Sequence, residues 1–295
     1  MTEHTEPLSL SLIYPHGENF IDVAEYVQMV HNHLGIFAKS VIDCDSPGCD
    51  TPDNLLYQRL VAVFDPDNSD GVIVYPGWEN CAASREAVKV AYRARLPIYR
   101  IGMTDAGPAL LPRVEVVGVC GWAQSGKDTV AGALVEDFGY SKASFADTLR
   151  DIVSVLNPII SDTGVRYADS VRDIGYEETK RVYPESRRVL QVLGTEGVRE
   201  FLDEEAWPLS LYLKIQDGAK VVIPDVRFEN EIDFVRYCGG KVWWVSRPEV
   251  SAPPFAHATE NSISPDHTDN IITNDGTVID IARKVSALMR EDSND

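Results

Sequence analysis

The sequence contains no run that approaches about 18 uninterrupted apolar residues, and its first residues, MTEHTEPLSLSLIYP, lack a basic start and a long apolar core. A membrane-spanning helix needs such a run, and a secretory signal needs both the basic start and the apolar core. We therefore expect a chain that is neither anchored in a membrane nor exported.

Positive charge is also scarce, because 27 Lys and Arg stand against 46 Asp and Glu, which gives a formal net charge of −19. Proteins that bind nucleic acid polymers neutralise backbone phosphates with clustered Lys and Arg. The composition therefore argues against a broad nucleic-acid-binding surface and against a nucleic acid polymer as partner. Single nucleotides remain open as ligands.

Cysteine is limited to five residues, an odd number. Cys120 lies in an apolar segment that we predict to be a strand, so we expect no disulfide framework and a reducing cytoplasm as the compartment. Cys44 and Cys49, with His31 and His33 upstream, match no strong zinc-binding spacing. We predict no zinc site there.

The length of 295 residues, with 44% hydrophobic and 25% charged residues, is typical of a globular protein with two domains. The segment 104–112 is rich in turn residues and precedes an apolar strand, so we expect it to link the domains. The predicted domains are therefore residues 1–110 and 111–295. We predict the α/β class, with two three-layer domains built on parallel sheets.

Strands alternate with helices in the first predicted domain, which favours a parallel sheet with helices on its faces. The strands are expected at 8–14, 71–75 and 96–102, and the helices at 20–34 and 83–94. Ligands of such sheets gather at the carboxyl ends of the strands. Here those ends hold the segments 14–17 and 76–79.

The segment Gly121-Trp-Ala-Gln-Ser-Gly-Lys-Asp-Thr129 lies between an apolar strand, 114–120, and a helix that begins near Lys127. Glycines at both ends let backbone N–H groups surround a polyphosphate, the helix N-terminus adds its positive dipole, and Lys127 can reach the terminal phosphates. The pattern predicts a nucleoside triphosphate as ligand. An ordinary glycine turn between strand and helix is the alternative.

Asp128 occupies the position at which phosphate loops normally carry a metal-binding Ser or Thr, and Thr129 follows one place later. A carboxylate beside phosphates would be repelled unless Mg²⁺ lay between them or Asp128 faced elsewhere. Asp128 and Thr129 are therefore rival metal ligands.

The second predicted domain carries groups suited to a phosphate acceptor. Arg187, Arg188 and Arg199 lie on predicted helices between 183 and 202, where they either bind a monophosphate or form a solvated helix face. The strand 220–225 brings Asp225 to the sheet edge, with Arg227 directed into the same crevice; a simple turn aspartate is the alternative.

Further elements are expected after this strand and between the phosphate loop and the basic helices. A short strand and a helix that opens with Asp147 and Arg150 follow the phosphate loop. A strand is expected at 239–247, then a strand, a turn at 274–276 and a helix to about 289. The polar segment 162–188 is the predicted lid over the phosphates.

The stretch DGVIVYPGWENCAASREAVKVAYRARLPIYRIG in the first half resembles the nucleoside 2-deoxyribosyltransferase-like family, whose fold is Rossmann-like. The resemblance implies that Glu86 is a nucleophile that attacks a deoxyribose C1′, with Ser84 near a substrate phosphate and Asp70 closing the preceding turn. A first-turn glutamate favoured by the helix dipole is the alternative.

Seven blocks in the second half occur in the order seen in phage-type deoxynucleoside monophosphate kinases: GWAQSGKDT, SFADTLR, RRVLQVLGTEGVR, IPDVRFENE, GGKVWWVSRP, HATE and IITNDGT. The likeness spans residues 113–290. It implies a P-loop nucleoside monophosphate kinase fold and transfer of the ATP γ-phosphoryl group, with Mg²⁺, to a deoxynucleoside 5′-monophosphate. A phage gene would place the enzyme in the cytoplasm of an infected host cell.

The same resemblance implies roles for particular residues. Lys127, Asp225 and Arg227 are expected to be catalytic. The groups that hold ATP and Mg²⁺ are expected to be Gly121, Ser125, Gly126, Lys127, Asp128, Thr129, Asn274, Asp275 and Gly276. The acceptor site is expected to contain Arg150, Gln191, Trp207, Asp225, Arg227 and Glu231. Packing is the alternative for Gln191 and Trp207, and strand termination for Gly276.

Two other functions remain open from the sequence. One is a deoxynucleotide N-glycosidase or deoxyribosyltransferase whose activity lies in the first half, and the other is a nucleotide sensor that binds without transfer. The expected partner is in each case a small deoxynucleotide rather than a polymer or a membrane. Neither the base of the acceptor nor the oligomeric state follows from the sequence, and a homodimer stays open.

Overall fold

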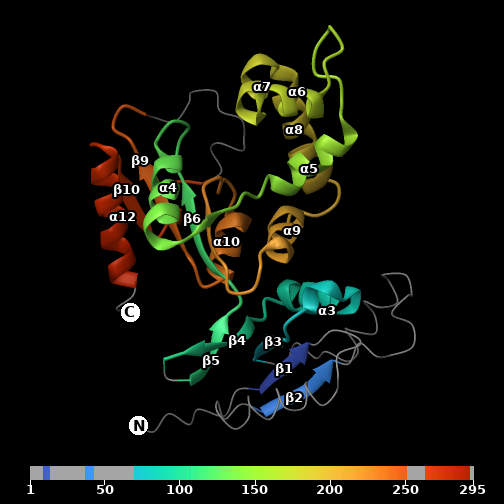
Figure 1. Ribbon diagram of the computed structural model, residues 1–295, viewed down its shortest axis with the longest axis vertical. Helices are drawn as coiled ribbons and strands as arrows, with labels where there is room; N and C mark the ends of the chain where they lie inside the picture. The colour runs from blue at the N-terminus through green and yellow to red at the C-terminus, as the bar shows by residue number, and fades with distance from the viewer. Residues whose placement is uncertain (1–8, 14–36, 43–69, 106, 251–262, 293–295) are drawn as a thin grey trace. The chain divides into compact units, whose positions relative to one another are not determined.

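The computed structural model describes residues 9–13, 37–42, 70–105, 107–250 and 263–292 (Figure 1). The chain divides into two compact units. Unit 1 comprises Met1–Glu115 and Gln216–Ala219, and unit 2 comprises Val116–Ile215 and Lys220–Asp295. The helix expected at 20–34, the loop 14–17 and the His and Cys residues considered for zinc lie outside the described residues.

Unit 1 contains a five-stranded sheet with the order β2-β1-β3-β4-β5. Its strands are β1 (Ser9–Ile13), β2 (Phe37–Ile42), β3 (Gly71–Val74), β4 (Ile98–Thr104) and β5 (Gly107–Pro112). β1 pairs in parallel with β2 and β3, and β3 pairs in parallel with β4. The predicted strands at 8–14, 71–75 and 96–102 are confirmed.

The segment 104–112 was expected to link two domains, and this prediction was wrong. Residues 107–112 form β5, which pairs antiparallel with β4 from Tyr99↔Pro112 to Thr104↔Gly107. The turn residues serve a tight hairpin, in which Gly107 has a φ of 112°. The chain leaves unit 1 only after Glu115.

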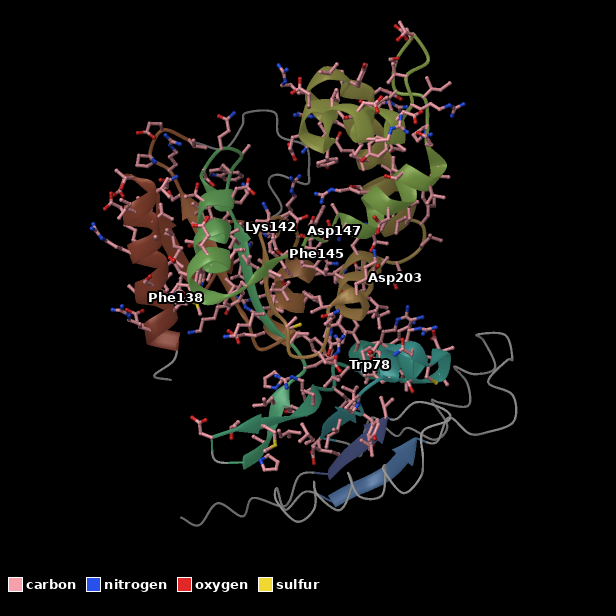
Figure 2. The ribbon with its side chains drawn as sticks, in the orientation of Figure 1. Trp78, Phe138, Lys142, Phe145, Asp147 and Asp203 are labelled. Carbon is pink, nitrogen blue, oxygen red and sulfur yellow. The ribbon has the colours of Figure 1, made fainter. Side chains whose placement is uncertain are left out.

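The helix α3 (Ala82–Arg93) buries one face, which includes Ala83, Ala87 and Ala91, and it confirms the helix expected at 83–94. A short 3-10 helix, Trp78–Asn80, precedes it, and Trp78 is fully buried (Figure 2).

Trp78 belongs to a clamp that holds the residues 216–219 in unit 1. Asp217 accepts hydrogen bonds from Trp78 Nε1 at 2.9 Å and from Arg113 Nε at 2.7 Å. Arg113 is 2% exposed, and its guanidinium lies 4.8 Å from the centre of the Trp78 ring. The clamp therefore combines an ion pair of the buried Arg113 with a cation–π contact. It fixes the turn at 216–219, which is distant in sequence, to the rest of unit 1.

Unit 2 contains a second five-stranded sheet, with the order β10-β9-β6-β8-β7. Its strands are β6 (Glu115–Cys120), β7 (Ser141–Lys142), β8 (Lys220–Ile223), β9 (Lys241–Ser246) and β10 (Asn270–Thr273). The pairs β10–β9, β9–β6 and β7–β8 are parallel. β6 is thus central, and its carboxyl end carries the predicted phosphate loop.

Helices cover both faces of this sheet (Figure 1). On one face, α4 (Lys127–Phe138) and α12 (Val278–Asp292) pack on β6 and β9 through a core that includes Leu134, Trp243 and Val285. On the other face lies α10 (Glu229–Tyr237), whose Phe234 makes an edge contact with Tyr212 of α9 (Ala206–Lys214). The α/β class with parallel sheets is confirmed.

The segment between β7 and α9 is helical. It contains α5 (Asp147–Leu156), α6 (Tyr167–Ile174), α7 (Tyr176–Val182) and α8 (Pro184–Gln191), followed by a π-helix, Val192–Arg199. The helix that opens with Asp147 is confirmed. The segment 162–188, predicted to be a lid, consists largely of α6, α7 and part of α8, so it is a folded helical element rather than an irregular loop.

Candidate active site

The phosphate loop has the backbone that its glycines predict. Gly121 and Gly126 have φ values of 133° and 104°, in the region that favours glycine. A Cβ on Gly121 would lie 2.3 Å from the Val245 carbonyl oxygen, and one on Gly126 would lie 2.3 Å from Asn274 Nδ2. The loop turns directly into α4 with Gly126 as its N-cap. Its amides and the helix N-terminus form a cradle suited to phosphate.

Two polar side chains of the loop are placed for a ligand. Ser125 is fully buried, and its Oγ makes no hydrogen bond with the described residues. Lys127 Nζ donates to the carbonyl oxygens of Gly121 and Trp122, each at 2.8 Å, so the ammonium group lies over the loop. An orphaned buried hydroxyl and an ammonium over a ring of amides fit a polyphosphate.

Asn274 braces this loop from the turn that follows β10. Its Nδ2 donates to the Ser125 carbonyl oxygen at 2.8 Å, and its backbone N–H donates to the Ser246 carbonyl oxygen at 2.6 Å. The neighbouring Asp275 is exposed and forms an ion pair with Lys284 at 2.6 Å; Gly276 is exposed. The family resemblance implies that this turn lies beside adenine, which stays a prediction; in the structure Asn274 is hydrogen-bonded to the phosphate loop itself.

The two rival metal ligands differ in exposure. Asp128 is 83% exposed and forms an ion pair with Lys142 of β7. Thr129 is partly buried in the first turn of α4, where its N–H donates to the Gly126 carbonyl oxygen at 3.0 Å. Asp128 thus already has a cationic partner on the surface.

A pocket of unit 2 joins the phosphate loop to the residues that follow β8. It is lined by Gly121, Trp122, Ala123, Lys127, Asp225, Val226, Arg227, Trp244 and Ile263. The structure therefore brings Lys127 together with Asp225 and Arg227, which follow it by more than ninety residues in sequence. Trp122 and Trp244, in edge contact with ring centroids 5.2 Å apart, form an aromatic wall that the sequence did not reveal.

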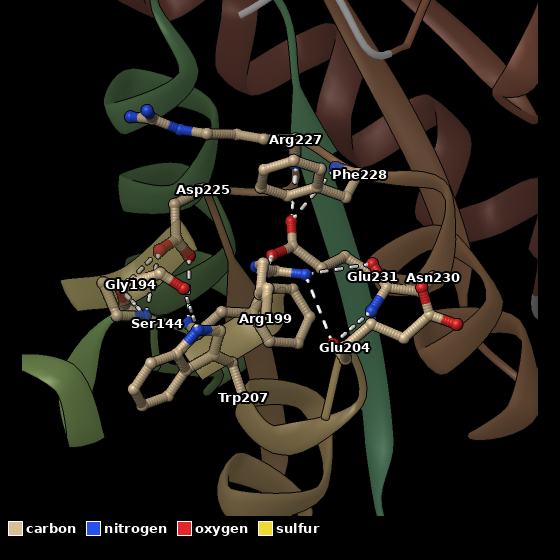
Figure 3. Close-up of polar contacts among 12 residues, drawn as sticks. Ser144, Gly194, Arg199, Glu204, Trp207, Asp225, Arg227, Phe228, Asn230 and Glu231 are labelled. Carbon is tan, nitrogen blue, oxygen red and sulfur yellow. Dashed lines mark hydrogen bonds and ion pairs between the residues drawn. The ribbon is translucent and has the colours of Figure 1, made fainter. Parts of the chain in front are cut away.

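Asp225 connects the end of β8 to the start of α5 (Figure 3). Its carboxylate accepts hydrogen bonds from Ser144 Oγ at 2.5 Å and from the N–H groups of Phe145 and Ala146 at 3.3 and 3.4 Å. Ser144 is buried and also donates its N–H to Asp147. Ser144 opens the block SFADTLR, but the sequence assigned it no role in the site.

Glu231 holds the turn that carries Arg227. Its carboxylate accepts from the N–H groups of Arg227 and Phe228, at 2.7 and 3.2 Å, and forms an ion pair with Arg199. The side chain is almost completely buried, and this burial raises the pKa of Glu231 to about 7, against the lowering effect of Arg199.

The enclosed carboxylate of Glu231 braces this turn, and its contact with an acceptor stays a prediction. Arg199 is occupied as well, since it also donates to Asn230 and lies 4.1 Å from the Phe228 ring centre. By contrast, the exposed side chain of Arg227 extends away from Glu231 (Figure 3). Arg227 is therefore the arginine of this turn that remains available to a ligand.

Arg150, predicted to bind the acceptor, is half-buried on α5. Its Nη1 donates to Asp147 at 2.8 Å, whereas the buried Nε makes no hydrogen bond with the described residues. Asp147 in turn accepts from Ser144, the partner of Asp225. Phe145 and Asp147 lie at the start of α5, where this network meets the helix (Figure 2).

Other predicted acceptor residues are not brought to the pocket. Trp207 is 5% exposed and donates Nε1 to the Gly194 carbonyl oxygen at 2.9 Å, which matches the packing alternative. Gln191 is exposed at the end of α8, and Arg188 forms an exposed ion pair with Glu185, as on a solvated helix face. Arg187 is exposed on the same helix.

In unit 1, Glu86 lies in α3 and forms an ion pair with Lys89; its side chain is 16% exposed. Ser84 is fully buried in the same helix, and Asp70 is exposed directly before β3. The loop 14–17, expected at the same sheet edge, lies outside the described residues.

Within the part of the chain that the structure describes, no group of three or more His, Cys, Asp or Glu side chains is placed to hold a metal ion. Among the same residues, no helix has the length and apolar character needed to cross a membrane.

Comparisons with known proteins point to one family. A family model described as deoxynucleotide monophosphate kinase matches residues 165–285. A protein of Acanthamoeba polyphaga mimivirus, named putative deoxynucleotide monophosphate kinase, is 30% identical over 151 residues, with 46% of this chain and 76% of that protein covered. The deoxynucleotide monophosphate kinase of Enterobacteria phage T4 is 25% identical over 189 residues, with 61% of this chain and 69% of that protein covered.

Among solved structures, the shikimate kinase of Aquifex aeolicus matches with a TM-score of 0.33 and 10% identity, covering 60% of this chain and 98% of that chain. This TM-score is too low to bear on fold or activity.

Proposed function

Because the chain belongs to the deoxynucleotide monophosphate kinase family, we propose that it transfers the γ-phosphoryl group of ATP to a deoxynucleoside 5′-monophosphate and forms the diphosphate. The observation that carries this proposal is the pocket in which Lys127 of the phosphate loop meets Asp225 and Arg227. The viral sources of the relatives suggest DNA precursor synthesis in the cytoplasm of an infected cell as the setting.

In this proposal an oxygen of the acceptor phosphate attacks the γ-phosphorus, the bond to the β–γ bridging oxygen breaks, and ADP leaves. No protein base is needed, because a phosphate monoester is largely ionised at pH 7 (second pKa about 6). Catalysis then consists of alignment and charge neutralisation. Lys127 supplies positive charge on the donor side, and Arg227 and Arg150 supply it on the acceptor side.

The remaining residues keep these charges in place. Asn274 and the two glycines shape the loop that would hold the ATP phosphates. Asp225 fixes the end of β8 against the start of α5 through Ser144, and Glu231 fixes the backbone of Arg227. Each of these contacts joins two elements that must keep their spacing while a phosphoryl group moves between them.

We further propose that Mg²⁺ accompanies ATP and that Thr129, rather than Asp128, is its protein ligand. Mg²⁺ at phosphoryl-transfer sites usually needs only one or two protein ligands, because phosphates and waters complete its shell. When bound, it would neutralise charge on the transferred group. The ion pair with Lys142 supports the choice, because it holds the exposed Asp128 carboxylate at the surface.

The variants Asp128→Asn and Thr129→Val test this choice. We expect Asp128→Asn to change kcat and the Mg²⁺ dependence of the rate by less than about 3-fold, because an exposed ion pair contributes at most about 1 kcal/mol. Thr129→Val keeps the shape but removes the hydroxyl, so the Mg²⁺ concentration for half-maximal rate should rise. A loss of activity confined to Asp128→Asn would assign the metal to the carboxylate.

The test of the activity is ADP release with Mg-ATP and each deoxynucleoside monophosphate in turn, including 5-modified pyrimidines, with products separated by chromatography. We expect ADP that depends on the acceptor, together with the matching diphosphate. Lys127→Ala should abolish transfer and leave the melting temperature unchanged. Lys214→Ala is the matched control, because Lys214 is an exposed lysine that pairs with Asp151. Full activity of Lys127→Ala would overturn the assignment.

Two other outcomes of this assay would indicate the remaining functions. Tight ATP binding without acceptor-dependent ADP would indicate a nucleotide sensor. Free base released without ATP would move the activity to the first half of the chain.

We keep that second function as a proposal, in which residues 1–110 form a nucleoside 2-deoxyribosyltransferase-like domain and 111–295 the kinase domain. The observation that favours it is the partial burial of Glu86 beside Lys89, on the helix that follows β3. Glu86→Gln should then abolish release of base, while acceptor-dependent ADP formation continues. If wild-type protein releases no base from any deoxynucleotide tested, this second function is excluded.

A further inference from the structure

We propose that Tyr176, the first residue of α7, is a positioning residue that holds the guanidinium of Arg150 for the phosphate of the acceptor. The inference rests on the proposed function and adds a residue to it. It identifies the α6–α7 segment as the part of the kinase that prepares the acceptor-phosphate site.

The guanidinium of Arg150 is restrained by Asp147 and by Tyr176. Nη1 donates to Asp147 at 2.8 Å, and the guanidinium carbon lies 4.5 Å from the centre of the Tyr176 ring. Among the described residues, the buried Nε makes no hydrogen bond, whereas the guanidinium also interacts with the Tyr176 hydroxyl. The Nε–Nη2 edge of an arginine is the one that binds two phosphate oxygens side by side. The buried Nε, a donor without a protein acceptor, is therefore set for an anion.

A second cation lies against the same ring. Lys180 Nζ is 4.3 Å from the Tyr176 ring centre, and its only charged partner among the described residues is the exposed Glu177. Two cations gathered at one tyrosine repel each other, and a bound dianion would relieve this repulsion. The ring thus keeps both positive charges close without neutralising either, which suits a phosphate monoester.

The position of Tyr176 is fixed by the helices around it. Gly175, with a φ of 82°, turns the chain between α6 and α7. The two helices are joined by a buried hydrogen bond between Ser170 and Thr179, 2.8 Å long. A ring mounted on two short, cross-linked helices can hold Arg150 within a narrow range of orientations.

A chain of hydrogen bonds links Arg150, and with it the contact to Tyr176, to the catalytic pocket. Arg150 donates to Asp147, Asp147 accepts from Ser144, and Ser144 donates to Asp225, which lines the pocket. Movement of Arg150 would therefore disturb a network that ends at Asp225. A residue that fixes Arg150 should affect the acceptor far more than ATP.

The experiment compares Tyr176→Leu, which removes the ring, with Tyr176→Phe, which keeps it. We expect Tyr176→Leu to raise the KM for the deoxynucleoside monophosphate about 10-fold, as the loss of a partly buried cation–π contact implies, with kcat and the KM for ATP within about 2-fold. Tyr176→Phe keeps the ring and loses only the hydroxyl that interacts with Arg150, so it should raise this KM far less than Tyr176→Leu. Tyr183→Leu is the control, because Tyr183 follows the same helix and no described cation lies against its ring.

A double variant separates positioning from packing. If Tyr176 acts through Arg150, then adding Tyr176→Leu to Arg150→Lys should raise the KM little further, because the two losses share one mechanism. Fully additive effects on the acceptor KM would show that Tyr176 only packs. The same conclusion would follow if kcat and the melting temperature fell while both KM values rose to a similar extent. If Tyr176→Leu does not fold, Tyr176→Met removes the ring with a flexible side chain of similar length, and an unchanged acceptor KM there would overturn the proposal.

Titration calorimetry with the monophosphate alone keeps this test independent of transfer. We expect the dissociation constant to rise about 10-fold in Tyr176→Leu and far less in Tyr176→Phe. If wild-type protein binds the monophosphate but transfers no phosphoryl group, only the proposed function fails, and the calorimetric comparison still decides the role of Tyr176. If the wild type binds no monophosphate, both proposals fail.

Discussion

The variant Gly126→Ala probes the phosphate loop at its most constrained point. Gly126 has φ 104° and ψ 21°, and an added Cβ would lie 2.3 Å from Asn274 Nδ2. Holding an L-residue at positive φ costs about 1–2 kcal/mol. Moving Asn274 breaks its hydrogen bond to the Ser125 carbonyl oxygen, worth about 1 kcal/mol. The sum of about 2–3 kcal/mol predicts a fall in kcat/KM for ATP of about 30- to 150-fold.

Two further variants separate the strain from the clash. Asn274→Ala should lower kcat/KM for ATP about 5-fold, because it loses one hydrogen bond. The double variant Gly126→Ala/Asn274→Ala removes the clash and leaves the strain at positive φ, so its loss should be smaller than the product of the two single losses.

Gly132→Ala is the matched control, since Gly132 lies within α4 and an added Cβ meets nothing within 4 Å. It should stabilise the protein by about 0.5–1 kcal/mol and leave the kinetics unchanged.

The assay is the rate of ADP release at saturating acceptor and varied ATP, with the melting temperature measured by circular dichroism. The reasoning would be refuted if Gly126→Ala kept kcat/KM for ATP within about 3-fold of wild type, or if Gly132→Ala fell as far as Gly126→Ala. Either result would mean that the backbone of the loop does not determine ATP use.

Two more predictions concern stability. Asp217→Ala should destabilise the protein by about 3 kcal/mol in urea unfolding, because it leaves Trp78 Nε1 without its acceptor and the buried Arg113 without its carboxylate; a loss below about 1 kcal/mol would contradict the clamp. The other prediction concerns Glu231, whose burial raises the pKa from 4.5 to about 7. Between these pH values the folded state keeps a proton on Glu231 that the unfolded state has lost. The free energy of unfolding should therefore fall by about 3 kcal/mol as pH rises from 4.5 to 7. Since Arg199 lowers this pKa, Arg199→Met should extend the fall to higher pH, and an unchanged pH profile would rule out this account.

Much of the secondary structure could be predicted because its signals are local. The apolar strand 115–120, the glycines of the loop and the helix from Lys127 all follow from residues within a few positions of one another. The hairpin of β4 and β5 was missed because Gly107, Pro108 and Pro112 are typical of linkers as well as of turns and edge strands.

The sequence by itself determined where the phosphate loop lies, which strands and helices surround it, and, through the blocks shared with a family, which reaction to expect. The tertiary structure alone decided that Asp128 faces Lys142, that Glu231 is buried against Arg199, and that Tyr176 lies against Arg150. The physical reason is the distance in sequence over which the two kinds of interaction act. Backbone conformation is governed by neighbouring residues, whereas the partner of a side chain depends on how elements distant in sequence pack together.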